Sequence, residues 1–161
     1  MNSHPLPLSI RSARHDDEAF LLSLLPRLAD FPLPEWRTAD EIGDGDRPLL
    51  LEALHGRIEH AAILVAELSP GGERAGYVFA TTKHDYFTRA AHAHVEVIAV
   101  TREAERRGVA RLLMEAIEQW ARRRGYRHLT LNVFDRNTRA KALYDSLGYE
   151  VETVHYRKTL S

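Results

Sequence analysis

Two stretches of this sequence combine residue types that bind anions with residue types that transfer protons. In the first, residues 95–113, an apolar strand pattern leads through a polar turn into an amphipathic helix pattern. The first turn of a helix presents unpaired backbone N–H groups and a partial positive charge, which suit a phosphate or pyrophosphate. Gly108 and Ala110 would let such a ligand approach the backbone. Taken alone, this turn favours an ordinary strand-to-helix connection with solvated arginines.

The second stretch, residues 137–149, is typical of a short capped helix. Asn137 precedes it as an N-cap, and Gly148 follows at the position where a left-handed residue commonly ends a helix. Within it lies Tyr144. A phenol with a pKa near 10 is protonated at neutral pH and can donate its proton. For an isolated tyrosine at this spacing, a place in the core is the simpler interpretation.

Polar residues also alternate with apolar ones in the strand pattern that precedes the polar turn. His92, His94 and Glu96 lie two residues apart and would share one face of the strand. A carboxylate or an imidazole at such a place can act as a general base. Two histidines and a carboxylate can also bind a metal, so a metal-binding protein is an alternative, although three ligands on one strand are geometrically cramped.

The elements that would position these residues alternate along the chain. We expect strands at residues 8–14, 62–68, 76–82, 92–100, 128–134 and 149–159. We expect helices from Asp16, over about residues 48–60, from Val109 to Gly125 and from Asn137 to Gly148, with a loop at residues 39–48. Several strands follow one another directly. The pattern therefore predicts an α/β fold with a mixed sheet flanked by helices, and not a doubly wound parallel sheet.

Length, charge and composition exclude several classes of protein and partner. The chain has 161 residues, which fits one domain, and a net charge of -1, which argues against nucleic acid as a partner. It contains no cysteine, so disulfides and thiol chemistry are excluded. The first residues lack a secretory pattern, and no apolar run is long enough for a membrane. A cytoplasmic protein without a membrane or nucleic-acid partner is the expectation.

Together, the two stretches resemble motifs of the GCN5-related N-acetyltransferases. Residues 105–110 are similar to that family's Arg/Gln-x-x-Gly-x-Gly/Ala turn, and residues 137–149 resemble its Asn-x-x-Ala-x-x-Leu-Tyr-x-x-x-Gly-Phe/Tyr signature. The positions that match the signature are Asn137, Ala140, Leu143, Tyr144, Gly148 and Tyr149. The resemblance covers nearly the whole chain and is weak between residues 31 and 60.

The resemblance implies one N-acetyltransferase domain over residues 1–161, with a mixed, mostly antiparallel central sheet. It implies that the acetyl group of acetyl-CoA passes to a primary amine of a small molecule or protein, which attacks the thioester directly and needs no metal. The residues that it implies for binding acetyl-CoA are Ile98, Val100, Arg106, Arg107, Gly108, Val109, Ala110, Arg111, Asn137 and Tyr144. Homodimers are common among such proteins, so a homodimer is one alternative, and the sequence leaves the oligomeric state open.

The resemblance also assigns catalytic roles. Tyr144 corresponds to the family residue that protonates the departing thiolate, and a backbone N–H near Ile98 would polarise the thioester carbonyl. Glu96 is preferred over His94 as the base that prepares the amine. One position departs from the family pattern, because Glu105 stands where Arg or Gln is usual. We expect this carboxylate to point outward, away from the diphosphate.

Two questions stay open at this level. A module that binds acetyl-CoA for regulation, without turnover, would carry the same motifs. The acceptor is not encoded in them, and we expect residues 31–60 and 83–91 to form its wall. Aromatic side chains in these segments are Phe31, Trp36, Tyr86 and Phe87, and acidic ones are Asp40, Glu41, Asp44 and Asp46. For the acidic group, a solvated loop is the simpler interpretation.

Overall fold

The computed structural model describes residues 7–68 and 72–161. Its strands are β1 (Leu8–Ser12), β2 (Ala62–Leu68), β3 (Glu73–His84), β4 (Ala91–Val100) and β5 (Leu129–Leu131). Its helices are α1 (Glu18–Ser23), α2 (Ala39–Gly45), α3 (Arg47–Leu54), α4 (Val109–Arg123) and α5 (Thr138–Ser146), with 3-10 helices at His15–Asp17, Leu25–Ala29 and Arg102–Ala104. None of the helices in this part of the chain is both long and apolar enough to span a membrane.

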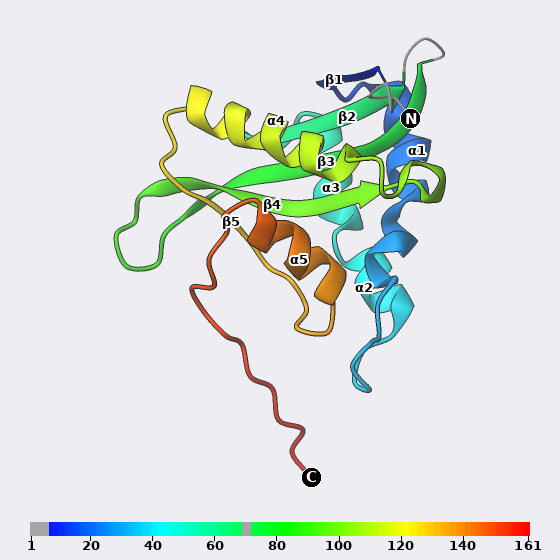
Figure 1. Ribbon diagram of the computed structural model, residues 1–161. Helices are drawn as coiled ribbons and strands as arrows, with labels where there is room; N and C mark the ends of the chain where they lie inside the picture. The colour runs from blue at the N-terminus through cyan, green and yellow to red at the C-terminus, as the bar shows by residue number, and fades with distance from the viewer. Residues whose placement is uncertain (1–6, 69–71) are drawn as a thin grey trace.

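The strands form one mixed sheet, as expected from the sequence, and their order in it is β1-β2-β3-β4-β5. The first four strands are antiparallel neighbours, and β5 joins β4 in parallel. Helix α4 covers one face of the sheet and α1–α3 the other, while α5 lies below the β4 edge in the view of Figure 1. Two apolar cores result, one under α4 and one under α1–α3.

Strand β4 contains one extra residue relative to β3. Phe79 pairs with Val97 and Ala80 pairs with Val95, which leaves Glu96 without a partner of its own. Such a bulge bends a strand and re-aims its side chains. Val95 accordingly packs in the core under α4, whereas Val97 packs in the opposite core. Strict alternation would have placed both on one face.

The segment predicted as an acidic loop, residues 39–48, is instead helix α2 followed by the start of α3. Thr38 begins α2 with a reciprocal cap. The backbone N–H of Glu41 donates to the Thr38 hydroxyl at 3.1 Å, and the backbone N–H of Thr38 donates to the Glu41 carboxylate at 2.9 Å. The two glycines of the segment led to the prediction of a loop, because glycine is unfavourable inside a helix. Helix α3 ends at Leu54, short of the expected residue 60.

The final strand predicted at residues 149–159 is not formed. These residues adopt neither helix nor strand, and Figure 1 shows them leaving α5 and running away from the sheet. A strand needs a neighbour to satisfy its backbone groups. In the described part of this single chain, the segment has no such neighbour.

A buried carboxylate ties the start of the chain to the sheet. Asp17 is fully buried and accepts hydrogen bonds from Arg11 at 2.7 and 2.9 Å and from the backbone N–H of Arg14 at 2.7 Å. Arg74 on β3 adds an ion pair at 3.0 Å. Hydrogen bonding by Arg11 outweighs the effect of burial and lowers the pKa of Asp17 below 3.8.

Replacing Asp17 with Asn should therefore lower the free energy of unfolding by about 3 kcal/mol at pH 7, because two arginines lose a buried partner. Since the folded pKa lies below the unfolded value, this stabilisation is present above pH about 4 and is lost as the pH falls through the folded pKa. Urea unfolding at pH 7 and pH 3 measures both effects. Asp16→Asn, on an exposed neighbour, is the matched control; equal losses in the two variants would contradict the prediction.

Candidate functional site

A cavity of about 700 Å³ lies where β4, β5, α4 and α5 meet the segment around α2. This volume is in the range of sites that hold small molecules or cofactors. Most of the residues singled out in the sequence line it: Glu96, Ile98, Val100, Arg106, Gly108, Val109, Ala110, Arg111, Asn137 and Tyr144. The fold thus brings the two sequence motifs to one place.

The turn before α4 has the form expected of an anion site. Gly108 precedes the helix with φ 78°, a left-handed conformation that glycine adopts without strain, and Arg106 also has a positive φ of 59°. The first backbone bond of the helix runs from the N–H of Leu112 to the carbonyl of Gly108. Within the described residues, the N–H groups of Val109, Ala110 and Arg111 have no backbone acceptor. Three donors at a positive helix end are therefore available to a ligand.

Glu105 does not point outward, contrary to expectation. It lines the cavity and pairs with two arginines, Arg27 from the 3-10 helix after α1 and Arg139 from the first turn of α5. Arg27 also donates to the backbone carbonyl of Val100, at the end of β4, at 3.2 Å. The positive charge of the two arginines thus compensates the carboxylate, and its electrostatic repulsion of an anionic ligand is weaker. Neither arginine stood out in the sequence, because their roles depend on elements far apart in the chain.

The edge of β4 is open beside this turn. Strand β5 pairs only with residues 93–95 of β4, so residues 96–100 have no strand on that side among those described. Ile98 and Val100 lie in this open part and line the cavity. An extended ligand can therefore pair with the β4 backbone there, in the manner of an added strand.

Helix α5 contributes one wall. Asn137 caps it, accepting a hydrogen bond from the backbone N–H of Ala140 at 3.2 Å, as predicted. Tyr144 is nearly buried, 9% exposed, and its ring meets that of Tyr149 edge to face at 5.9 Å between centroids. Burial raises the pKa of Tyr144 above its usual 10.0. The phenol is therefore protonated across the physiological pH range and available as a proton donor.

Glu96, the extra residue of the β4 bulge, lies in a polar cluster. Its Oε1 accepts a hydrogen bond from the Thr81 hydroxyl at 2.6 Å and pairs with Lys83 Nζ at 3.2 Å. Its Oε2 lies 3.9 Å from His94 Nε2, which confirms that the two side chains share a face. Lys83 and Thr81 were not recognised in the sequence, since only the β3–β4 register brings them to Glu96.

His94 is held from its other side by β5. Its Nδ1 lies 2.7 Å from the hydroxyl of Thr130, and its side chain is almost fully buried. Burial, followed by the charge of Lys83, lowers the pKa of His94, and the opposing effect of Glu96 does not restore it. The imidazole is consequently neutral at pH 7.

The cavity has further carboxylates opposite β4. Glu41 on α2 and Asp46, between α2 and α3, line it together with Arg37. Burial and then the negative charge of Glu96 raise the pKa of Asp46, while Lys83 opposes this. Of the expected acceptor wall, residues 31–60 contribute to the cavity, but residues 83–91 do not. The four aromatic residues expected there, Phe31, Trp36, Tyr86 and Phe87, are not among its lining residues.

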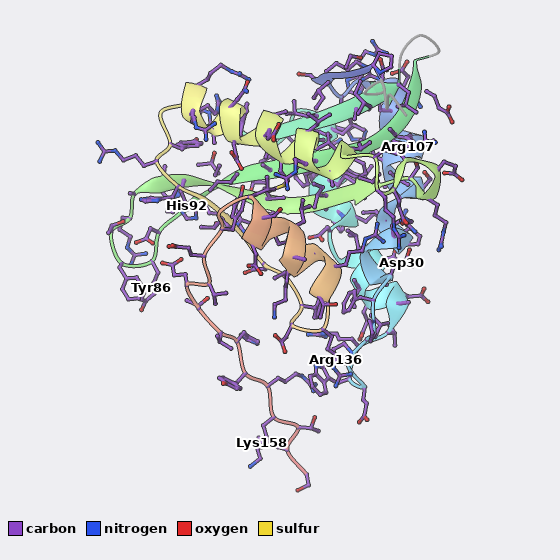
Figure 2. All side chains as sticks on the ribbon, viewed as in Figure 1. Asp30, Tyr86, His92, Arg107, Arg136 and Lys158 are labelled. Carbon is purple, nitrogen blue, oxygen red and sulfur yellow. The ribbon has the colours of Figure 1, made fainter. Side chains whose placement is uncertain are left out.

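Two sequence predictions do not fit this arrangement. Arg107 is exposed beside the turn before α4 and does not line the cavity (Figure 2). In residues 7–68 and 72–161, no three His, Cys, Asp or Glu side chains are grouped so as to hold a metal. His92 therefore does not join His94 and Glu96 in a metal site, and the metal-binding alternative is wrong for this cluster.

Comparison with known proteins agrees with these features. The profile of the Acetyltransferase (GNAT) family matches residues 25–149. The chain is 29% identical to aminoglycoside N(6')-acetyltransferase type 1 of Salmonella typhimurium over 105 residues. These aligned residues cover 62% of this chain and 71% of that protein. It is 27% identical over 156 residues to the uncharacterized N-acetyltransferase YhfO of Bacillus subtilis, covering 92% and 95%.

A solved structure shows the same fold. A putative acetyl transferase from Pyrococcus furiosus superposes with a TM-score of 0.73 at 22% identity, covering 95% of this chain and 99% of that one. Aminoglycoside N-acetyltransferase AAC(6')-Iy in complex with CoA gives a TM-score of 0.69 at 22% identity, covering 99% and 100%. With the family profile spanning both motifs, these likenesses are enough to place the protein: the chain belongs to the GNAT acetyltransferase family.

Proposed function

We propose that the protein is an acetyl-CoA-dependent N-acetyltransferase that acts on a cationic small-molecule amine. One observation carries this proposal: three features line the same cavity. They are the open edge of β4, the N–H groups without a backbone acceptor at the start of α4, and the phenol of Tyr144. The whole chain, residues 1–161, would act as one catalytic domain. A cytoplasmic location stays a prediction from the sequence.

The residues fit acetyl-CoA in a specific order along the cavity. The N–H groups of Val109, Ala110 and Arg111, with the charge of Arg106, suit the diphosphate. Ile98 and Val100 would pair with the pantetheine arm, and Asn137 would face the bound molecule from α5. Arg107, which lies outside the cavity, would contribute only its long-range charge. When bound, acetyl-CoA supplies an acetyl thioester to the amine.

The amine must lose a proton to attack. An alkylamine with a pKa of about 10.4 is neutral in only about one molecule in 2,500 at pH 7. Glu96 is the proposed base, because its carboxylate lines the cavity and Thr81 and Lys83 hold it in place. His94 Nε2 lies 3.9 Å from Glu96 Oε2, beyond direct hydrogen-bond distance, so passing the proton on to this neutral imidazole would need a bridging water. An N–H donor near Ile98 would stabilise the oxyanion by roughly 3 kcal/mol.

Tyr144 is the proposed general acid. The departing CoA thiolate needs a proton, and the buried phenol holds one throughout the physiological pH range. The ammonium form of the amine gives up two protons, one towards Glu96 before attack and a second from the nitrogen after the new C–N bond forms. The C–S bond breaks, the thiolate takes the proton of Tyr144, and Tyr144 is reprotonated from solvent, so that one proton is released overall.

The acceptor is proposed from the charges on the other side of the cavity. The three carboxylates of Glu41, Asp46 and Glu96 still outnumber the cations of Arg37 and Lys83 there, so the local field attracts cations. The relative from Salmonella typhimurium is an aminoglycoside acetyltransferase. A polycationic amine such as an aminoglycoside would satisfy several of these carboxylates at once and is our first candidate.

Release of CoA thiol from acetyl-CoA tests the activity with aminoglycosides, polyamines and amino acid amides, in parallel with calorimetric titration of acetyl-CoA. The chain has no cysteine, so the protein adds no thiol background. We expect release with polycationic amines above the other classes. Binding of acetyl-CoA without release from any amine would favour the regulatory alternative. Failure to bind acetyl-CoA would overturn the proposal.

Tyr144→Phe should lower kcat by about 100-fold while leaving acetyl-CoA affinity within about twofold, because the ring stays and only the proton donor is lost. Tyr149→Phe is the matched control, since it removes a neighbouring hydroxyl that bonds to Glu118 at 3.2 Å outside the reaction path. Steady-state rates of both variants decide the matter. If the two variants lose the same activity, Tyr144 is not the general acid.

Glu96→Gln should lower kcat/KM by about 100-fold at pH 7, and the deficit should shrink as the pH rises towards the pKa of the amine. At high pH the acceptor is already neutral, so a base is no longer needed. Lys83→Gln keeps the carboxylate and removes its ion pair, and it should retain most of the activity. A Glu96→Gln deficit that is constant with pH would assign Glu96 to acceptor binding instead of proton removal.

A further inference from the structure

Lysine is rare in this chain. Of the 22 lysine and arginine residues, only Lys83, Lys141 and Lys158 are lysines. A lysine amine can be acetylated once it is neutral, whereas an arginine guanidinium keeps its charge at physiological pH. The chain therefore offers few side-chain amines to an acetyl donor, and their places in the structure can be compared one by one.

Lys83 is the lysine whose ammonium lies beside the proposed base. It extends from β3, and its Nζ lies 3.2 Å from Glu96 Oε1 in the polar cluster at the β4 bulge. Its charge also acts on two other residues of the cavity, because it opposes the raised pKa of Asp46 and contributes to the lowered pKa of His94. One amine of the chain thus already lies where the acceptor amine is proposed to lose its proton.

The two other lysines lie elsewhere. Lys141 on α5 pairs with the exposed Asp135 at 2.8 Å, and Lys158 is exposed in the segment after α5. Neither is a lining residue of the cavity. Figure 2 shows Lys158 well separated from the sheet that carries Glu96. These two lysines therefore serve as internal controls for any direct reaction between acetyl-CoA and an accessible amine.

The contact between Lys83 and Glu96 lies at the border between the cavity and solvent. Glu96 lines the cavity and Lys83 does not. The lysine side chain is 45% exposed and the glutamate side chain 10% exposed, so the ammonium approaches the carboxylate from the solvent side. A lysine has a flexible four-carbon stem, which lets its nitrogen turn about such a contact.

We propose that Lys83 is a self-acetylation site: without an amine acceptor, the protein transfers the acetyl group of acetyl-CoA to Nζ of its own Lys83. The inference rests on the proposed function, because it uses Glu96 as the base and Tyr144 as the acid. The flexible side chain turns Nζ from the Glu96 carboxylate into the space between Glu96 and Tyr144, where an acceptor amine would react.

The transfer follows the same chemistry as the proposed reaction. The Lys83 ammonium gives one proton to Glu96, and the neutral Nζ attacks the thioester carbon. The new C–N bond forms, the C–S bond breaks, and the nitrogen loses its second proton. The thiolate takes the proton of Tyr144, which is reprotonated from solvent. The products are acetylated Lys83, CoA thiol and one released proton.

Acetylation would change the charge of the site. The acetylated Lys83 side chain is neutral and no longer forms an ion pair with Glu96. Of the cations beside the carboxylates of Glu41, Asp46 and Glu96, Arg37 then remains. The cavity becomes more negative, so the modified protein attracts a cationic acceptor more strongly.

Peptide mass spectrometry of the full chain incubated with acetyl-CoA alone tests the proposal. We expect acetylation of Lys83 to be about 10-fold or more faster than that of Lys141 and Lys158, because only this amine has the base beside it. Lys83→Arg keeps the positive charge and offers no amine, so it should gain no fast acetyl group. Equal rates at the three lysines, or an unmodified Lys83, would overturn the proposal.

The variant Glu96→Gln separates self-acetylation from direct chemical acetylation. An opposite charge favours the protonated form of an amine, so removing the carboxylate would speed a direct reaction at Lys83. Self-acetylation loses its base in this variant, and labelling of Lys83 should slow by about 10-fold or more. Tyr144→Phe keeps the ion pair and lacks the acid, and it should slow labelling as well. Faster labelling in Glu96→Gln would contradict the proposal.

Mixed incubations test whether each chain modifies itself. Unaltered chains and Tyr144→Phe chains are incubated together with acetyl-CoA and resolved by their intact masses. We expect the unaltered chains to be labelled at a rate constant that does not change on dilution, while Lys83 of the variant stays unlabelled. Labelling of the variant by the unaltered chains would rule out transfer within one chain.

Failure of this inference is distinguishable from failure of the proposed function. Calorimetric titration of acetyl-CoA and thiol release with the amine panel are measured on the same sample. If acetyl-CoA binds and an amine is acetylated while Lys83 stays unmodified, the self-acetylation alone is wrong. If acetyl-CoA does not bind, both proposals fail.

Discussion

The site depends on the separation of β4 from β5. The two strands pair over three residues of β4, 93–95, and then part, so that in the described part of the chain no strand pairs with the remainder of β4 on the side of the cavity. A sheet that continued to pair would have filled this space with a neighbouring strand. The bulge at Glu96 lies at the same point, so the strand bends where it loses its partner. Helices α4 and α5 then wall the opening with an N-terminus and a phenol.

Charge divides the cavity into two environments. Near α4, the helix N-terminus combines with Arg106 and Arg111, and the one acid of that turn, Glu105, is compensated by Arg27 and Arg139. Opposite it, Glu41, Asp46 and Glu96 supply negative charge, and burial followed by the charge of Glu96 raises the pKa of Asp46. An anionic donor and a cationic acceptor could thus enter the same cavity from different sides, with the reacting groups meeting between Glu96 and Tyr144. This division supports the proposed activity more than any single residue does.

Much of the fold followed from local patterns. The strand at residues 62–68, the amphipathic stripe of α4, the Asn137 cap and the closing Gly148 were all readable because period, cap chemistry and left-handed glycine act within a few residues. Helix α2 was missed because its glycines outweighed the Thr38 cap. The strand predicted after α5 is not formed, because a strand must pair with an edge and this segment runs away from the sheet.

The sequence by itself determined the family motifs, the glycine turn before α4 as a candidate anion site, and the candidate roles of Tyr144 and Glu96. Tertiary structure alone decided which of these residues share a cavity, that Arg107 stays outside it, and that Glu105 is neutralised by Arg27 and Arg139. It also decided that Thr81 and Lys83 hold Glu96, since a strand register and a bulge set those contacts. The physical reason is one of range: caps, turns and periodicity are local, whereas electrostatic compensation and register arise between segments that only folding brings together.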